Sequence, residues 1–161
     1  MSLPDRRFLL LLPLLVLAAC GFEPAYGPGG SGTALRNSIQ IEAPEDRNAY
    51  LLVRELETRL GRTATPTYAL DLEIETTEEG LGVDSADNTN RFDLLGSADF
   101  VLRDLRSGQI VTSGRVENFT GYSATGTTVA TLAAERDAQQ RLMTILADQI
   151  VTRLLAATLP G

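Results

Sequence analysis

Apolar and polar residues alternate strictly over residues 68–76, where Tyr68, Leu70, Leu72 and Ile74 are separated mostly by acidic residues. This period of two predicts a strand with one face buried and the other in water, as in antiparallel sheets. Weaker versions of the same pattern predict three more strands. We expect them at 37–42, at 92–102 and at 109–120, the last with Ile110, Thr112 and Val116 facing inward.

Two segments carry apolar residues at helical spacing instead. The first follows the helix-start signal Pro44-Glu45-Asp46 and ends before Gly61, and Glu55 and Arg59 form an i,i+4 ion pair on it. The second begins near 127–128 and runs almost to the C-terminus. Its apolar stripe consists of Ala138, Leu142, Ile145, Leu146, Ile150, Val151 and Leu154.

These elements occur in the order β-α-β-β-β-α, joined by a predicted polar loop at 77–90 and a turn at 105–108. The order predicts an α+β fold: a two-layer sandwich in which two helices cover one face of a four-stranded sheet. The other face would be open and charged. It would carry Asp71, Glu73, Glu75, Arg91, Asp93, Asp99, Arg103, Arg115 and Glu117.

Composition excludes most enzyme chemistries. The 161 residues carry a net charge of −7, with no His and a single Cys, and all 14 basic residues are Arg. Without His there is no imidazole base and no His-ligated metal, and one Cys cannot form a thiolate cluster. The acidic balance argues against nucleic-acid binding. We therefore expect no catalytic residue, no metal site and no cofactor.

The N-terminus has the organisation of a secretory signal peptide. Arg6 and Arg7 precede the apolar run 8–17, which is too short to span a bilayer. The segment Leu17-Ala18-Ala19-Cys20 resembles the bacterial lipobox. This resemblance implies cleavage after Ala19, attachment of diacylglycerol to Cys20 and acylation of the new N-terminus, which together anchor a protein stably. Gly21 follows, and by resemblance to bacterial sorting rules this favours the outer membrane.

Three segments follow from this reading: a signal peptide at 1–19, a lipidated tether at 20–33 and a single folded domain at 34–161. The tether is predicted from its Gly and Pro content and from its lack of periodicity.

The stretch Cys20-Gly-Phe-Glu-Pro-Ala-Tyr-Gly27 resembles the opening of the lipopolysaccharide-assembly lipoprotein family (LptE). The element order, the helix containing 55–60 and the helix entry at 134–138 are similar as well. The resemblance implies a non-enzymatic subunit of the outer-membrane lipopolysaccharide translocon. Such a subunit sits as a plug inside the large lipopolysaccharide-translocating β-barrel, in a one-to-one complex, supports its assembly and can contact lipopolysaccharide.

If the three longer strands form a meander, the start of the third strand and the entry to the last helix meet at one end. Arg91 and Arg136 could then bind the phosphates of lipopolysaccharide near a helix N-terminus. Against this stand Asp84 and Asp87 in the same region, which repel anions.

Two other functions stay open at this point. One is an auxiliary lipoprotein of a periplasmic lipid or solute transport system, which binds its ligand without a barrel. The other is a periplasmic hydrolase that uses carboxylates such as Asp71 and Glu73, although no nucleophile motif supports it.

Overall fold

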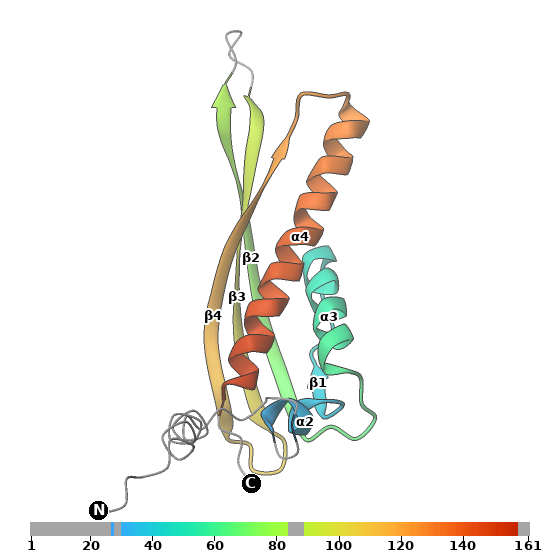
Figure 1. Ribbon diagram of the computed structural model, residues 1–161, viewed down its shortest axis with the longest axis vertical. Helices are drawn as coiled ribbons and strands as arrows, with labels where there is room; N and C mark the ends of the chain where they lie inside the picture. The colour runs from blue at the N-terminus through green and yellow to red at the C-terminus, as the bar shows by residue number, and fades with distance from the viewer. Residues whose placement is uncertain (1–26, 28–29, 84–88, 158–161) are drawn as a thin grey trace, which may run out of the picture.

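The computed structural model describes residues 27, 30–83 and 89–157. Figure 1 shows an elongated molecule in which long strands and a long helix run side by side. The elements are, in chain order, α2 (Ser31–Leu35), β1 (Ile39–Ile41), α3 (Arg47–Leu60), β2 (Tyr68–Val83), β3 (Thr89–Asp104), β4 (Ile110–Ser123) and α4 (Thr128–Leu155).

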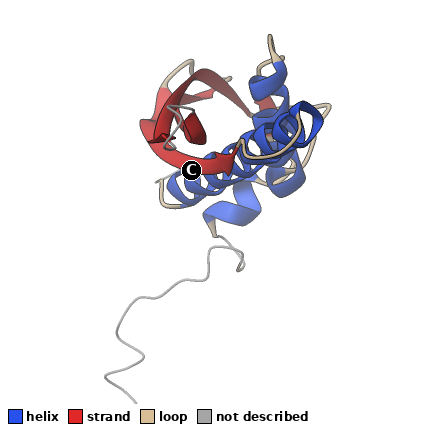
Figure 2. Cartoon of the chain, turned by 90° about the horizontal axis from the view of Figure 1, so that it is seen from above, coloured by secondary structure: helices blue, strands red, loops and turns tan. Residues whose placement is uncertain are grey.

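The four strands form one sheet in the order β1-β2-β3-β4. The short strand β1 runs parallel to β2, whereas β2, β3 and β4 form an antiparallel meander. Helices α3 and α4 both lie on one side of this strongly twisted sheet (Figure 2). The predicted α+β sandwich is therefore confirmed, with the short helix α2 as an addition.

The predicted loop at 77–90 is wrong over most of its length, because β2 continues to Val83 and β3 begins at Thr89. The sequence Thr77-Glu-Glu-Gly-Leu-Gly82 has low strand propensity and no alternation. Pairing with β3 overrides that propensity, with Glu78 opposite Leu94 and Gly80 opposite Phe92. Irregular register next to Gly80 and Gly82 marks the weakest part of the ladder.

The expected inward position of Ile110 is also wrong, since its side chain is 56% exposed. The register between β3 and β4 shifts after Leu102, so that Arg103 pairs with Ile110 while Leu102 pairs with Thr112. This shift moves Val111 toward the core in place of Ile110. Val116 is buried as predicted.

Helix α3 has the predicted ends. The Asp46 side chain accepts a hydrogen bond from the Ala49 N–H at 2.7 Å, and Gly61 ends the helix with φ of +81°. A Cβ at Gly61 would also collide with the Asn37 side chain. Glycine is therefore required there both by backbone conformation and by space.

Helix α4 packs closely on the middle of the sheet. Leu142, Leu146 and Ile150 are fully buried against strand residues such as Phe100. A Cβ at Gly96 would lie 2.8 Å from Cδ2 of Leu142, so the absence of a side chain there allows the close approach. Of the predicted stripe only Ile145 is partly exposed, while Met143 and Ala147 join the core.

The folded part begins slightly earlier than the tether prediction implied. Helix α2 starts at Ser31, and the hydroxyl of Thr33 donates a hydrogen bond to the Gly27 carbonyl at 3.1 Å. Leu35, at the end of α2, is fully buried. Cys20 and Ala19 lie outside the described residues.

Candidate functional site: the open face of the sheet

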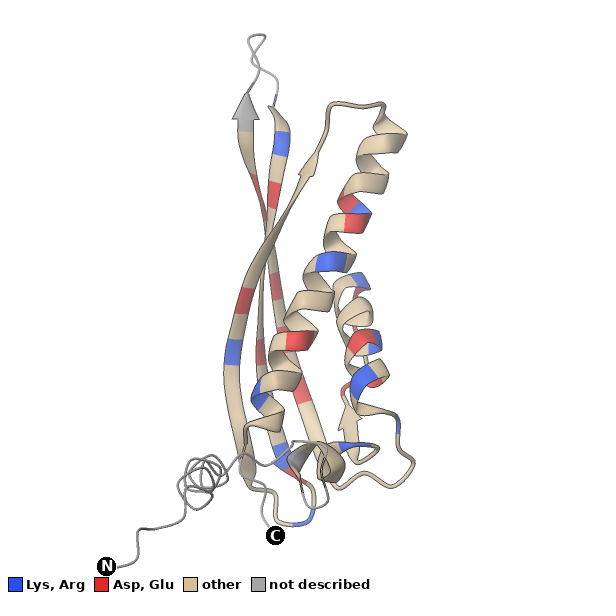
Figure 3. Cartoon of the chain, in the orientation of Figure 1, with Lys and Arg blue, Asp and Glu red and all other residues tan. Residues whose placement is uncertain are grey.

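The face of the sheet that carries no helix displays its residues in rows across β2, β3 and β4. These rows follow from the register, because residues directly opposite one another point to the same side. The charged residues that were predicted for an open face all lie on it, joined by Glu79. Figure 3 shows acidic and basic positions spread along the three strands.

Arg115 on β4 organises the centre of this open face. Its guanidinium donates to Glu117 at 2.7 Å, to Asp99 at 2.6 Å and to Glu75 at 3.2 Å, and so links all three strands. It also donates to the hydroxyl of Ser97 at 2.8 Å. The hydrogen bond to Glu117, followed by that to Glu75, raises the pKa of Arg115 above its ordinary value.

A hollow of about 480 Å³ lies at this network, and its lining includes Glu75, Ser97, Arg115 and Glu117. Leu95 and Phe119 face each other across β3 and β4 at its apolar part, with Thr77 beside Leu95 on β2. Phe119 is 62% exposed and Leu95 is 36% exposed. An exposed apolar pair on a face that is otherwise mostly polar and charged is a candidate contact surface.

The open face carries more negative charge than its arginines balance. It has seven acidic residues and three arginines: Asp71, Glu73, Glu75, Glu79, Asp93, Asp99 and Glu117 against Arg91, Arg103 and Arg115. Arg103 pairs with Asp71 at 3.0 Å. Glu73, Glu79 and Asp93 have no ion-pair partner among the residues that the structure describes.

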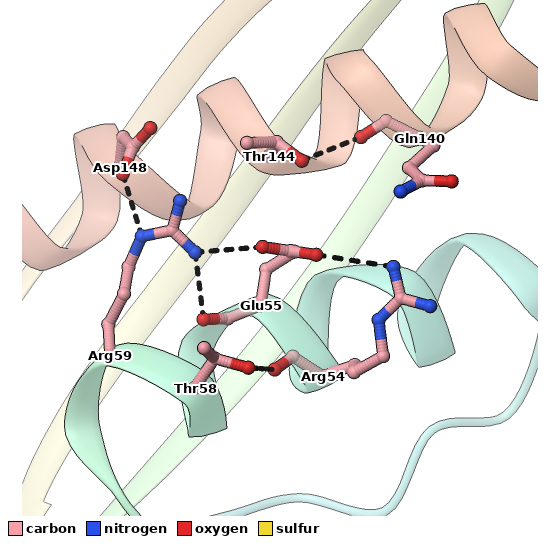
Figure 4. Close-up of polar contacts among 7 residues, drawn as sticks. All are labelled: Arg54, Glu55, Thr58, Arg59, Gln140, Thr144 and Asp148. Atoms are coloured by element: carbon pink, nitrogen blue, oxygen red, sulfur yellow. Dashed lines mark hydrogen bonds and ion pairs between the residues drawn. The ribbon is translucent and has the colours of Figure 1, made fainter.

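The two helices have a polar seam of their own on the other side of the molecule (Figure 4). Arg59 donates to Asp148 of α4 at 2.7 Å and to Glu55 at 2.9 Å, which confirms the predicted i,i+4 pair. The hydrogen bond from Arg59 lowers the pKa of Glu55. These contacts join α3 to α4 and so serve the fold.

The start of β3 and the end of β4 meet as expected, since the Ala124 N–H donates to the Asn90 carbonyl at 2.9 Å. Arg91 and Arg136 nevertheless lie on opposite sides of the sheet. Arg91 is exposed on the open face, while Arg136 is exposed on α4, which covers the other face. The structure therefore does not bring the two side chains together.

On the helix side of that same end lies a cluster that the sequence analysis missed. Phe92 stacks on Tyr122 with ring centroids 5.3 Å apart, and the Tyr122 hydroxyl donates to Glu78 at 2.7 Å. Burial, and then the hydrogen bond to Glu78, raise the pKa of Tyr122. The missed signal was the cross-strand position of two aromatic residues, which required the register to be known.

Within 27, 30–83 and 89–157, no helix has both the length and the apolar character that a membrane crossing needs. The same described residues contain no group of three metal-ligating side chains.

A family model described as lipopolysaccharide-assembly (LptE) matches residues 36–154. The chain belongs to the LptE family. No curated protein sequence matches it significantly.

Three solved structures similar to this LptE-family chain are of proteins described as lipoproteins. A protein of Caulobacter crescentus CB15, assigned provisionally as a lipoprotein, has a TM-score of 0.66 and 28% identity over 78% of this chain and 93% of that one. Rare lipoprotein B of Shewanella oneidensis has a TM-score of 0.57 and 14% identity, over 74% and 92%. The minor lipoprotein of Acinetobacter baumannii has a TM-score of 0.56 and 18% identity, over 78% and 97%.

Membership of the LptE family makes this chain an envelope lipoprotein with a general role in lipopolysaccharide assembly. The family is non-enzymatic and works with components of lipopolysaccharide transport.

Proposed function

We propose that this chain is an outer-membrane lipoprotein, anchored through Cys20, that supports assembly and function of the lipopolysaccharide-translocating β-barrel. It acts as a plug-like subunit, in a one-to-one complex, during insertion of lipopolysaccharide into the outer membrane. It faces the periplasm or sits within the barrel lumen.

The observation that carries this proposal is the combination of family membership with a long, one-sided sandwich. Helix α4 has 28 residues and is about 42 Å long at 1.5 Å per residue. A bilayer with its headgroups is about 40–45 Å thick. The domain is thus long enough to fill a barrel lumen over most of the membrane, and its charged open face suits the polar interior of a wide barrel.

The anchor is the second support. The first described helix starts at Ser31, only a short stretch of sequence after Cys20. Acyl chains on Cys20 would therefore hold the α2 end of the domain close to the membrane surface.

Co-purification from cells tests the proposal. We expect a tagged chain, extracted in mild detergent, to bring down a large β-barrel in equal amounts. A matched Cys20→Ser variant should lose the lipid and be recovered in the soluble fraction. Recovery of the intact chain without any barrel, together with components of another transport system, would contradict the proposal and favour an auxiliary lipoprotein.

Lipopolysaccharide contact by Arg91 and Arg136 belongs to this proposal as two separate sites, because the side chains lie on opposite sides of the sheet. We expect Arg91→Glu and Arg136→Glu to weaken binding of lipopolysaccharide by the purified protein independently of each other. Unchanged binding in the double variant would remove both residues from the proposal.

A further inference from the structure

The hollow on the open face combines two features that the fold does not use. Leu95 and Phe119 form an exposed apolar pair across β3 and β4. Carboxylates flank this pair on both sides along the strands: Glu79 and Asp93 one row away in one direction, and Glu75 and Glu117 one row away in the other. The pair lies outside the buried core and keeps much of its apolar surface in water, inside an acidic border.

The acidic border is also unbalanced on one side. Glu79 and Asp93 are directly opposite each other across β2 and β3. Like charges in this arrangement destabilise a sheet. Neither carboxylate has an ion-pair partner in the described parts of the chain, whereas Glu75 and Glu117 both pair with Arg115. The border beside Glu79 and Asp93 is therefore suited to receive cations from outside.

We propose that this hollow receives an apolar side chain of a protein partner, whose neighbouring Arg or Lys side chains meet the carboxylates of Glu79 and Asp93. The inference deepens the proposed function and rests on it, since it assigns the open face to the partner. The apolar side chain packs against Leu95 and Phe119. The flanking cations relieve the repulsion between the two opposed carboxylates, which gives the contact its specificity.

Charge favours this occupant over a second copy of the chain, a lipid headgroup or another segment of the chain itself. A second copy would present the same net negative face and be repelled. A lipid phosphate would also be repelled at this border, where Glu79 and Asp93 have no ion-pair partner among the described residues, in contrast to the contact proposed for Arg91 farther along β3. The chain's own remaining segments are poorly suited too. Once residues 1–19 have been removed as predicted, the segments outside the described residues are 20–26, 28–29, 84–88 and 158–161. They contain no Arg or Lys, so none of them can neutralise the border.

Paired variants of the full-length lipoprotein test the two features separately. We expect Leu95→Gln/Phe119→Gln and Glu79→Arg/Asp93→Arg each to lower the amount of co-purified partner about tenfold, as loss of a central contact does. The matched controls change exposed residues elsewhere: Val129→Gln/Leu132→Gln on α4, and Glu42→Arg/Glu45→Arg before α3. They should lower it less than about twofold. Equal losses in variants and controls, with circular dichroism unchanged, would overturn the inference.

A photo-crosslinking residue, p-benzoylphenylalanine, at position 119 identifies the occupant in intact cells. A crosslink to a protein segment with Arg or Lys beside an apolar residue supports the inference. A crosslink to lipid, to this chain itself or to an acidic segment overturns it.

The two proposals can fail separately. If the barrel co-purifies with every open-face variant, the proposed function stands and this inference fails. If no barrel co-purifies with the wild-type chain, the proposed function fails. The crosslink at position 119 then decides the inference alone.

Discussion

The two faces of the sheet are made by the same strands but have opposite properties. On β3, Ala98 is fully buried beneath the helix layer, while its neighbour Asp99 points to the open face and keeps 43% of its side chain exposed. Helix α4 packs so closely against one face that a side chain at Gly96 would collide with Leu142. The other carries charge and an apolar hollow. The comparison teaches that the covered face holds the buried core, whereas the open face keeps its charges and its apolar pair exposed to solvent.

The test with the largest expected effect replaces one phenylalanine on each face by alanine. Phe100 is 1% exposed under α4, whereas Phe119 is 62% exposed on the open face. We expect Phe100→Ala to lower the free energy of unfolding by about 3–5 kcal/mol. Phe119→Ala should change it by less than about 0.5 kcal/mol. Urea denaturation followed by circular dichroism measures both, and similar losses would refute the division between the faces.

The close approach of α4 to the sheet can be tested at Gly96. We expect Gly96→Ala to cost about 1–3 kcal/mol, because the new Cβ would press on Leu142. In a Leu142→Ala background the same change should cost less, since the space has been opened. Additive losses in a double-mutant cycle of urea unfolding would show that the two positions do not touch.

A buried hydrogen bond also joins the sheet to α4. The hydroxyl of Thr120, which is 8% exposed, donates to the Ala138 carbonyl at 3.0 Å. Thr120→Val keeps the shape but removes the donor, and we expect a loss of about 1 kcal/mol in the free energy of unfolding. Ser113→Val on the open face is the control and should be close to neutral. If Thr120→Val were equally neutral, this bond would contribute nothing to the covered face.

The smallest effect concerns the polar seam behind the helices and its pH dependence. Arg59 lowers the pKa of Glu55, so this pair stabilises the fold above the ordinary carboxyl pKa of about 4.3. That contribution is lost as pH falls through the lowered pKa of the folded state. We expect Glu55→Gln to cost about 0.5 kcal/mol at neutral pH.

The difference between wild type and Glu55→Gln should vanish in acid. Thermal unfolding at a series of pH values measures it. A difference that persists unchanged below the lowered pKa would assign the effect to packing instead of charge.

Sequence alone predicted most of the covered face and the charges of the open one. Alternation at Tyr68–Ile74 and the stripe around Leu142 follow from local periodicity, which needs no knowledge of partners in space. The extension of β2 through Gly80 could not be predicted, because pairing with β3 overrides a poor strand sequence.

The same limit applies to the site. The charged residues were predicted to share a face, but the Arg115 network and the hollow lined by Leu95 and Phe119 depend on register. The displacement of Ile110 by Val111 also depends on a register shift that no local pattern marks. The same reasoning wrongly placed Arg91 and Arg136 together. It predicted correctly that both lie at the same end of the sheet, but local patterns did not show that they lie on opposite faces.

The most direct test of the central claim is the accessibility of position 77 in the cell envelope, because Thr77 lines the hollow beside Leu95. Cys20 is the only cysteine and is predicted to carry lipid, so Thr77→Cys would introduce the one free thiol and leave Leu95 and Phe119 unchanged. We predict that a maleimide labels this thiol readily in the isolated lipoprotein and poorly in the intact envelope, where the partner covers the open face. Equal labelling in both states would contradict the account.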